Sequence, residues 1–370
     1  MAEVIQQENI RRRLFKLAAP IFIETLLIMM LGAVDVIMLS RHSDNSVAAV
    51  GVVNQIIVLT FLIFEVINLG TSVLCSQYLG AKMHKNVVQV VGVSLLMNLV
   101  VGVSVSLFLF GMNETILQWM GLTPELMKDG TDYMRIVGAF AFFQAISLTL
   151  SASLRSANKA IYPMMVTVVV NVLNIIGNYT LIFGEFGFPE MGVEGAAIST
   201  AFSRGVSMVI LFIILFRKHI RKFPLAYFRP FPFKELKNLL KVGLPSAGEQ
   251  LSYSSSQVVI TYFINALGME ALAARTYSVN IIMFSFLFSI AIAQGGAICI
   301  GHLIGEKRPH AAFLLGKYVM KKSVLITVCL SLITALMGPF IFGWLTTNEQ
   351  IIRMGVTILA IDVILEIGRP

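Results

Sequence analysis

The sequence contains few charged residues and lacks the motifs that catalysis or metal binding usually requires. Only 13% of its 370 residues are Asp, Glu, Lys or Arg, whereas a soluble globular domain has about 25%. Its three cysteines form no CxxC pair, and its five histidines have no metal-ligand spacing. The sequence has no glycine-rich phosphate loop and no hydrolase constellation. These absences exclude an ordinary soluble domain and argue against an enzyme or a direct user of ATP.

Long apolar runs fill most of the chain instead. Hydrophobic residues make up 57% of it, and several runs exceed the roughly 20 residues that a helix needs to cross a bilayer. We predict ten membrane-spanning helices, at 14–39, 47–77, 87–111, 131–153, 161–183, 193–216, 239–265, 271–301, 313–343 and 350–370. The sequence therefore predicts an all-α, multi-pass protein of the plasma or inner membrane.

The connections between the predicted spans alternate in charge. Most of the 28 lysines and arginines lie in every second connection, and the other connections are acidic. The positive-inside rule then places the N-terminus in the cytoplasm. Because topology accounts for the net charge of +8, we expect no nucleic-acid partner. The expected partners are the lipid bilayer and small drug-like molecules, and we expect a monomer.

The chain repeats itself at a fixed offset. The segment Leu14–Pro20, LFKLAAP, matches Leu239–Pro245, LLKVGLP, and at the same offset of 225 Glu24 falls on Glu249. The two tryptophans of the chain, at 119 and 344, also obey this offset. Such a register over more than a hundred residues indicates an internal duplication.

The duplication divides the chain into two lobes. We predict a six-helix N-terminal lobe over 1–216, a basic cytoplasmic linker over 217–238 and a C-terminal lobe over 239–370. Six spans is an even number, so the lobes should be parallel repeats about an axis along the membrane normal. The second lobe holds counterparts of the first four spans alone. We therefore expect about ten helices of a twelve-helix protein here, with a stable ten-helix protein as the alternative.

Several short motifs, in this order along the chain, are similar to those of one transporter family. They are Leu17–Pro20, Val34–Asp35, Gln77–Gly80, Leu154–Ala157, Leu173–Asn174, Leu181–Gly184, Gly192–Ala197 and Gly243–Pro245. The whole chain resembles the MATE (multidrug and toxic compound extrusion) family of the MOP superfamily. The resemblance implies two pseudo-symmetric six-helix bundles that export organic, cationic compounds by alternating access. It also implies antiport with H⁺ or Na⁺ and no other cofactor.

A lipid or lipid-linked oligosaccharide flippase of the same superfamily is the alternative function. A flippase of this kind should have a cavity rich in Arg and Lys that binds a pyrophosphate. The charges that we place at membrane depth are acids, with Arg204 as the exception. The sequence therefore favours the multidrug antiporter.

Four polar residues of the first lobe are candidates for cation coupling. Asp35 is a carboxylate within an apolar span, where an ionisable group usually has a function, although it could instead form an ion pair at the outer face. Asn174 and Asn178 lie one turn apart on one helix face, where they could bind Na⁺ with Asp35 or form interhelical hydrogen bonds. The resemblance adds Thr200 as a fourth ligand. The second position is often Asp in the family, so Asn178 removes one negative charge.

Other acids within the spans are candidates for a substrate cavity. Glu24 and Glu249 are repeat equivalents that could attract cationic substrates, or could be buried acids held by serine or backbone partners. Glu65, Asp362 and Glu366 are further acids at membrane depth. We expect all five to contribute to the cavity.

Two equivalent prolines lie near the starts of their spans. Pro20 and Pro245 could bend these helices, or could be ordinary prolines at a helix start. The resemblance implies that bending of the first span couples Asp35 to closure of the drug cavity. Asp35 falls on Ile260 in the second repeat, so we expect coupling in the first lobe alone.

Overall fold

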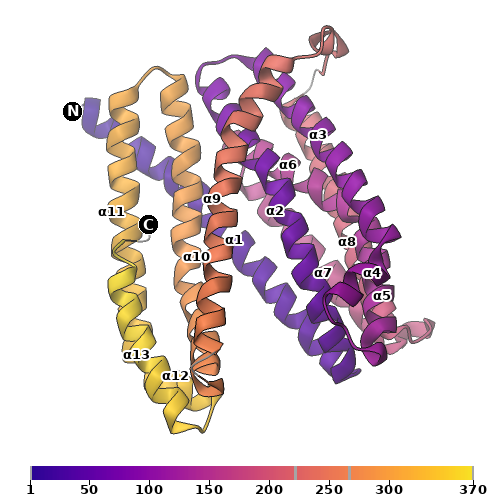
Figure 1. Ribbon diagram of the computed structural model, residues 1–370. Helices are drawn as coiled ribbons and strands as arrows, with labels where there is room; N and C mark the ends of the chain where they lie inside the picture. Colours follow the sequence, from indigo (N-terminus) through magenta and orange to yellow (C-terminus); the bar gives the residue numbers. More distant parts are fainter. Residues whose placement is uncertain (1, 221–222, 266–267, 369–370) are drawn as a thin grey trace. The chain divides into compact units, whose positions relative to one another are not determined.

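Helices are the only regular secondary structure in the residues that a computed structural model describes, which are 2–220, 223–265 and 268–368. Within these residues the α-helices are α1 Ala2–Ser40, α2 Asp44–Gly80, α3 His84–Gly111, α4 Asn113–Trp119, α5 Pro124–Ala139, α6 Ala141–Ser156, α7 Ile161–Phe183, α8 Gly192–Ile214, α9 Phe233–Asn265, α10 Met269–Gly305, α11 Pro309–Leu336, α12 Gly338–Leu345 and α13 Glu349–Leu365 (Figure 1). This architecture confirms the predicted all-α class.

Fewer helices than predicted are long and apolar enough to cross a membrane unaided. In the described part of the chain seven helices meet this test, namely α1, α2, α3, α7, α8, α10 and α11. The predicted span 131–153 is wrong as a single helix, because the chain breaks between α5 and α6 and bends there by 44°. The predicted span 313–343 likewise breaks between α11 and α12.

The seventh and tenth predicted spans are helical but fall short of the same test. They correspond to α9 and α13. α9 carries the polar stretch GEQLSYSSSQ in its middle, and α13 has 17 residues and ends at Leu365 rather than at 370.

The helix boundaries repeat with the offset found in the sequence. α2 covers 44–80 and α10 covers 269–305, while α3 covers 84–111 and α11 covers 309–336. Both ends of each pair differ by 225. Even the left-handed residue after α2, Lys82 with φ 58°, recurs after α10 as Lys307 with φ 59°. The duplication therefore includes the backbone conformation of the turns.

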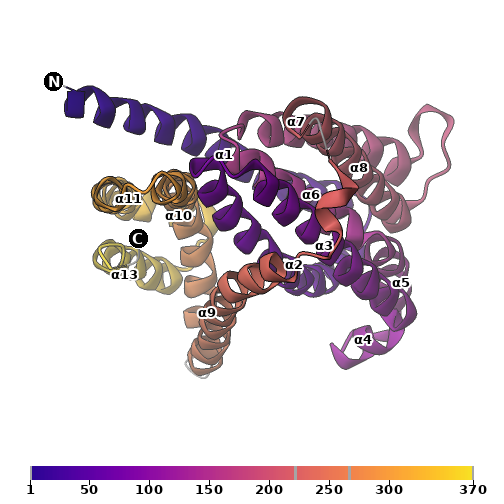
Figure 2. The same cartoon turned by 90° about the horizontal axis from the view of Figure 1, so that it is seen from above.

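The helices pack into two compact units, and each unit is described by itself. One contains the chain up to Phe22 and from Gly248 onward, and the other is Ile23–Ala247. In the first of these α10 packs against α11 and α13, and in the second α6 packs against α2, α3 and α8. Figure 2 shows each set of helices from above.

The boundaries of the units fall inside two equivalent helices. Each lies two residues after a proline within a helix, Pro20 in α1 and Pro245 in α9. A proline inside a helix cannot donate the usual backbone hydrogen bond. α1 and α9 thus each change packing partners just after a position where the helix is weakened. The predicted lobes divide the chain by its repeat, whereas these units divide it by contacts.

Candidate functional site

Asp35 of α1 belongs to a polar cluster inside the Ile23–Ala247 unit. The Asn178 Nδ2 atom donates to Asp35 Oδ1 at 2.6 Å and to Asn174 Oδ1 at 3.1 Å. The Asn174 Nδ2 atom in turn donates to Thr200 Oγ1 at 3.3 Å. The structure therefore joins the four predicted coupling residues in one chain of hydrogen bonds across α1, α7 and α8.

Close packing of α7 against α8 holds the two amides in place. A Cβ atom at Gly177 would overlap the Ser199 hydroxyl of α8, so glycine is needed at this approach. The Ser199 hydroxyl donates to the Asn174 backbone carbonyl at 3.0 Å. Asn174 and Asn178 are buried, with 2% and 1% of their surfaces exposed. The cluster is therefore fixed by the helix contact itself.

Two further residues, to which no sequence pattern assigned a role, complete the cluster. The buried Tyr133 of α5 interacts through its hydroxyl with Thr200 and with the charges of Asp35 and Arg204. Arg204 of α8 acts electrostatically on Asp35 and lies 5.3 Å from the centre of the Phe61 ring. Its spacing of four residues from Thr200 could have placed Arg204 on this face. No such signal marked Tyr133, whose helix ends at an unexpected break.

The oxygens of this cluster suit a hard monovalent cation. They belong to a carboxylate, two amides and a hydroxyl, the oxygen types that hard cations prefer. The Asn178 Oδ1 atom is buried and has no hydrogen-bond partner among the described residues. The same residues contain no group of three His, Cys, Asp or Glu side chains that could hold a metal ion. The residues present therefore fit Na⁺ or a proton better than a transition metal.

A second charged cluster lies in the same unit. The Arg155 Nη2 atom donates to Glu24 Oε1 at 2.6 Å, and Glu24 is 4% exposed. Glu65 accepts a hydrogen bond from Asn68 Nδ2 at 2.8 Å and interacts electrostatically with Arg155. Arg155 lies in the last turn of α6, two residues beyond the end of the predicted span 131–153. Glu24 is thus held by an arginine, which the sequence did not indicate.

The other predicted cavity residues belong to the unit that contains the chain from Gly248 onward. Glu249 is exposed on α9, whereas Asp362 and Glu366 are buried near the end of α13. Asp362 accepts a hydrogen bond from the Ser331 hydroxyl at 3.1 Å. The five predicted cavity acids are therefore distributed over both units, two in one and three in the other.

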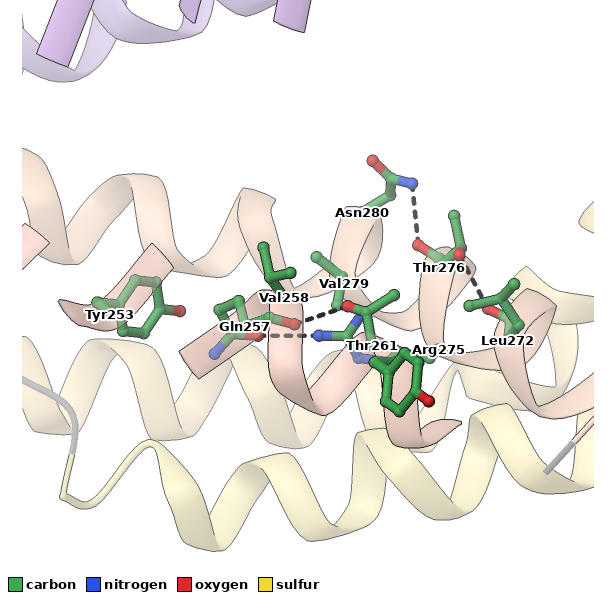
Figure 3. Close-up of a pocket in the computed structure, with 10 residues that line it drawn as sticks. Tyr253, Gln257, Val258, Thr261, Leu272, Arg275, Thr276, Val279 and Asn280 are labelled. Carbon is green, nitrogen blue, oxygen red and sulfur yellow. Dashed lines mark hydrogen bonds between the residues drawn. The ribbon is translucent and has the colours of Figure 1, made fainter. Parts of the chain in front are cut away.

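The unit from Gly248 onward also contains a pocket between α9 and α10, with a volume of about 780 Å³. Figure 3 shows Arg275 of α10 reaching toward α9, where it donates to Thr261 Oγ1 at 2.7 Å and to Gln257 Oε1 at 2.9 Å. Arg275 is a second arginine, besides Arg204, inside a helix that is long and apolar enough to span the membrane. The position of Arg275 in the predicted span 271–301 could have revealed it.

Comparison with known proteins identifies the family. The family model described as MatE matches residues 20–180 and 245–369, two segments whose starts are 225 residues apart and coincide with Pro20 and Pro245. The chain belongs to the MATE family. The resemblance seen in the sequence is therefore confirmed, and the protein is a multi-pass membrane transporter of this family.

Relatives of this MATE protein cover most of its length. The "Uncharacterized transporter YisQ" of Bacillus subtilis is 40% identical over 96% of this chain and 78% of its own length. The "Probable multidrug resistance protein NorM" of Thermotoga maritima is 28% identical over 94% of this chain and 74% of its own. A crystal structure described as MATE in the bent conformation, 23% identical, has a TM-score of 0.88 over 97% of this chain and 79% of that chain. The fold is thus that of MATE transporters.

Proposed function

We propose that this MATE protein exports organic, cationic drug-like compounds in antiport with H⁺ or Na⁺, by alternating access. The observation that carries the proposal is the hydrogen bond of 2.6 Å between Asn178 and Asp35. It links a carboxylate on α1 to a buried amide pair on α7, so a cation that binds here changes the contacts of α1. The names of several relatives, such as the Thermotoga maritima protein, support drugs as substrates.

The proposed cation site consists of Asp35, Asn174, Asn178 and Thr200. The cation supplies a positive charge that competes with Arg204 for the Asp35 carboxylate. Binding would therefore loosen Asp35 from its present partners, and α1 could rearrange near Pro20, where it passes from one packing unit to the other. Substrate and cation should weaken each other's binding equally, because coupling between two sites is reciprocal.

The proposal also covers the membrane location, the oligomeric state, the cofactors and the acids of the substrate cavity. We place it as a monomer in the plasma or inner membrane, with a cytoplasmic N-terminus and no cofactor beyond the coupling ion. The acids Glu24, Glu65, Glu249, Asp362 and Glu366 would contribute negative potential for cationic substrates. The lipid-flippase alternative is favoured by one observation, the arginine of the α9–α10 pocket.

The test is efflux of ethidium from cells under separately imposed H⁺ and Na⁺ gradients. We expect Asp35→Asn to reduce gradient-driven efflux at least tenfold, because it removes the charge while keeping the size of the side chain and one acceptor oxygen. Asp44→Asn is the matched control, since Asp44 is an exposed acid at the start of α2. Unchanged efflux by Asp35→Asn at equal expression would contradict the proposal. The gradient that drives wild-type efflux identifies the coupling ion.

A further inference from the structure

The positive charge of Arg275 has no negative partner among the described residues. Both of its hydrogen-bond acceptors, Gln257 Oε1 and Thr261 Oγ1, are neutral. None of the ion pairs found in the described ranges involves Arg275, and the pocket lining contains no Asp or Glu. An arginine within a membrane-spanning helix is costly unless something compensates its charge. A negatively charged ligand would supply that compensation.

The guanidinium of Arg275 is arranged to accept such a ligand. It carries five N–H donors, and two are used by Gln257 and Thr261. These two residues lie one turn apart on α9, so they hold the guanidinium from the same side (Figure 3). The remaining N–H groups can bind both oxygens of a carboxylate or phosphate in parallel. Because its neighbours already fix the side chain, little conformational entropy is lost on binding.

The rest of the pocket suits the apolar part of a small molecule. Its volume of about 780 Å³ lies within the range of about 300–1,000 Å³ that is usual for ligand sites. Tyrosine, valine and leucine side chains form much of the wall, from Tyr253, Val258, Tyr262, Leu272 and Val279. A single fixed charge beside an apolar wall fits an amphiphilic ligand.

We propose that the α9–α10 pocket binds the oxyanion, a carboxylate or phosphate, of an amphiphilic molecule through Arg275. This inference rests on the proposed transport function, because it adds anionic or zwitterionic amphiphiles to the substrates. The oxyanion can come from a soluble compound or from a lipid headgroup, since Arg275 lies about 9 Å from the start of α10. The chemistry recognised is the same for both sources.

The experiment measures binding of dansyl undecanoic acid, a fluorescent amphiphilic carboxylate, to the full chain in phosphatidylcholine nanodiscs. We expect Arg275→Met to raise the Kd at least tenfold, which corresponds to about 1.4 kcal/mol, because the variant loses the charge and the paired N–H donors that bind the carboxylate. Arg275→Lys should give a smaller increase, since it keeps the charge and loses the paired donors. Arg353→Met, which changes an exposed arginine of α13, is the matched control. The methyl ester of the probe should bind weakly to every variant.

A lipid arm separates the two sources of the oxyanion. Replacing half of the phosphatidylcholine with phosphatidylglycerol should weaken probe binding more in the wild type than in Arg275→Met if a lipid phosphate occupies the site. An equal effect in both assigns the site to soluble anions. Either result supports an oxyanion site. Equal Kd values for wild type and Arg275→Met would overturn it. An ester that binds the wild type as tightly as the acid would overturn it as well. The binding assay needs no gradient, so its result does not depend on the antiport. If Asp35→Asn left efflux unchanged, that result would contradict the proposed antiport and would leave the oxyanion site standing.

Discussion

Removing Arg155 should destabilise the Ile23–Ala247 unit far more than removing its partner Glu24. The Arg155 and Glu24 side chains are 18% and 5% exposed and their charged atoms are 2.6 Å apart. Leaving a buried charge without its partner costs about 3–5 kcal/mol. Arg155→Gln leaves two carboxylates, Glu24 and Glu65, without their cation. Glu24→Gln leaves Arg155 with Glu65, so the charges of the cluster still balance.

The two changes together should therefore be less harmful than Arg155→Gln alone. The double variant carries one uncompensated carboxylate, Glu65, whereas Arg155→Gln carries two. We expect Glu24→Gln to recover more than half of the stability that Arg155→Gln loses. Such suppression is the signature of a shared charge, because independent sites would add their costs.

Native cysteines provide the assay. Cys75, 1% exposed, lies in the same unit as the pair, and Cys299, also 1% exposed, lies in the other. In a background where the exposed Cys329 is serine, the rate of maleimide labelling at Cys75 follows the population of the opened unit. A cost of 3 kcal/mol raises that rate on the order of a hundredfold. Labelling of Cys299 should not change and serves as the internal control.

Two outcomes would refute this reasoning. One is labelling of Cys75 in Glu24→Gln that is as fast as in Arg155→Gln. The other is a double variant that labels faster than Arg155→Gln. Either would mean that Glu65 does not share the charge of Arg155.

Two further predictions concern contacts that the N-terminal part of α9 makes inside the Ile23–Ala247 unit. A Cβ atom at Gly243 would overlap the Val66 carbonyl oxygen of α2. Gly243→Ala should therefore lower the free energy of unfolding by about 1–3 kcal/mol, because it forces the helices apart. The unfolding midpoint in mild detergent measures this loss. Gly248→Ala, where the added Cβ meets nothing within 4 Å, should leave that midpoint unchanged or higher, and equal losses for both would contradict the packing argument. The Tyr78 hydroxyl donates at 2.7 Å to Glu235, which is 3% exposed, so Tyr78→Phe should cost about 1.5 kcal/mol. In Glu235→Gln the same tyrosine change should cost clearly less, and an undiminished cost would show that the charge of Glu235 is not involved.

The positions of helix breaks and charge partners show where sequence patterns stop being informative. Helices in lipid are apolar on all sides, so periodicity does not reveal which face meets a neighbour. The break after Ala139 is marked by no proline, and the predicted span ran straight through it because the single Gly138 beside it is not a sufficient signal. The partner of Glu24 is 131 residues away, at Arg155. A contact over that distance depends on the rotation and depth of both helices, which one sequence does not specify.

The sequence by itself determined the helical class, the duplication with its offset of 225 and the family, and it predicted Asp35, Asn174 and Asn178 as coupling residues, to which the family resemblance added Thr200. These features are local or periodic, because apolar runs, repeated motifs and a one-turn spacing can be read without long-range contacts. Tertiary structure alone decided that Arg155 pairs with Glu24, that Tyr133 and Arg204 join Asp35, and that α1 and α9 change packing units just after their prolines. Each of these depends on how separate helices pack, since only packing brings distant polar groups within a few ångströms of one another.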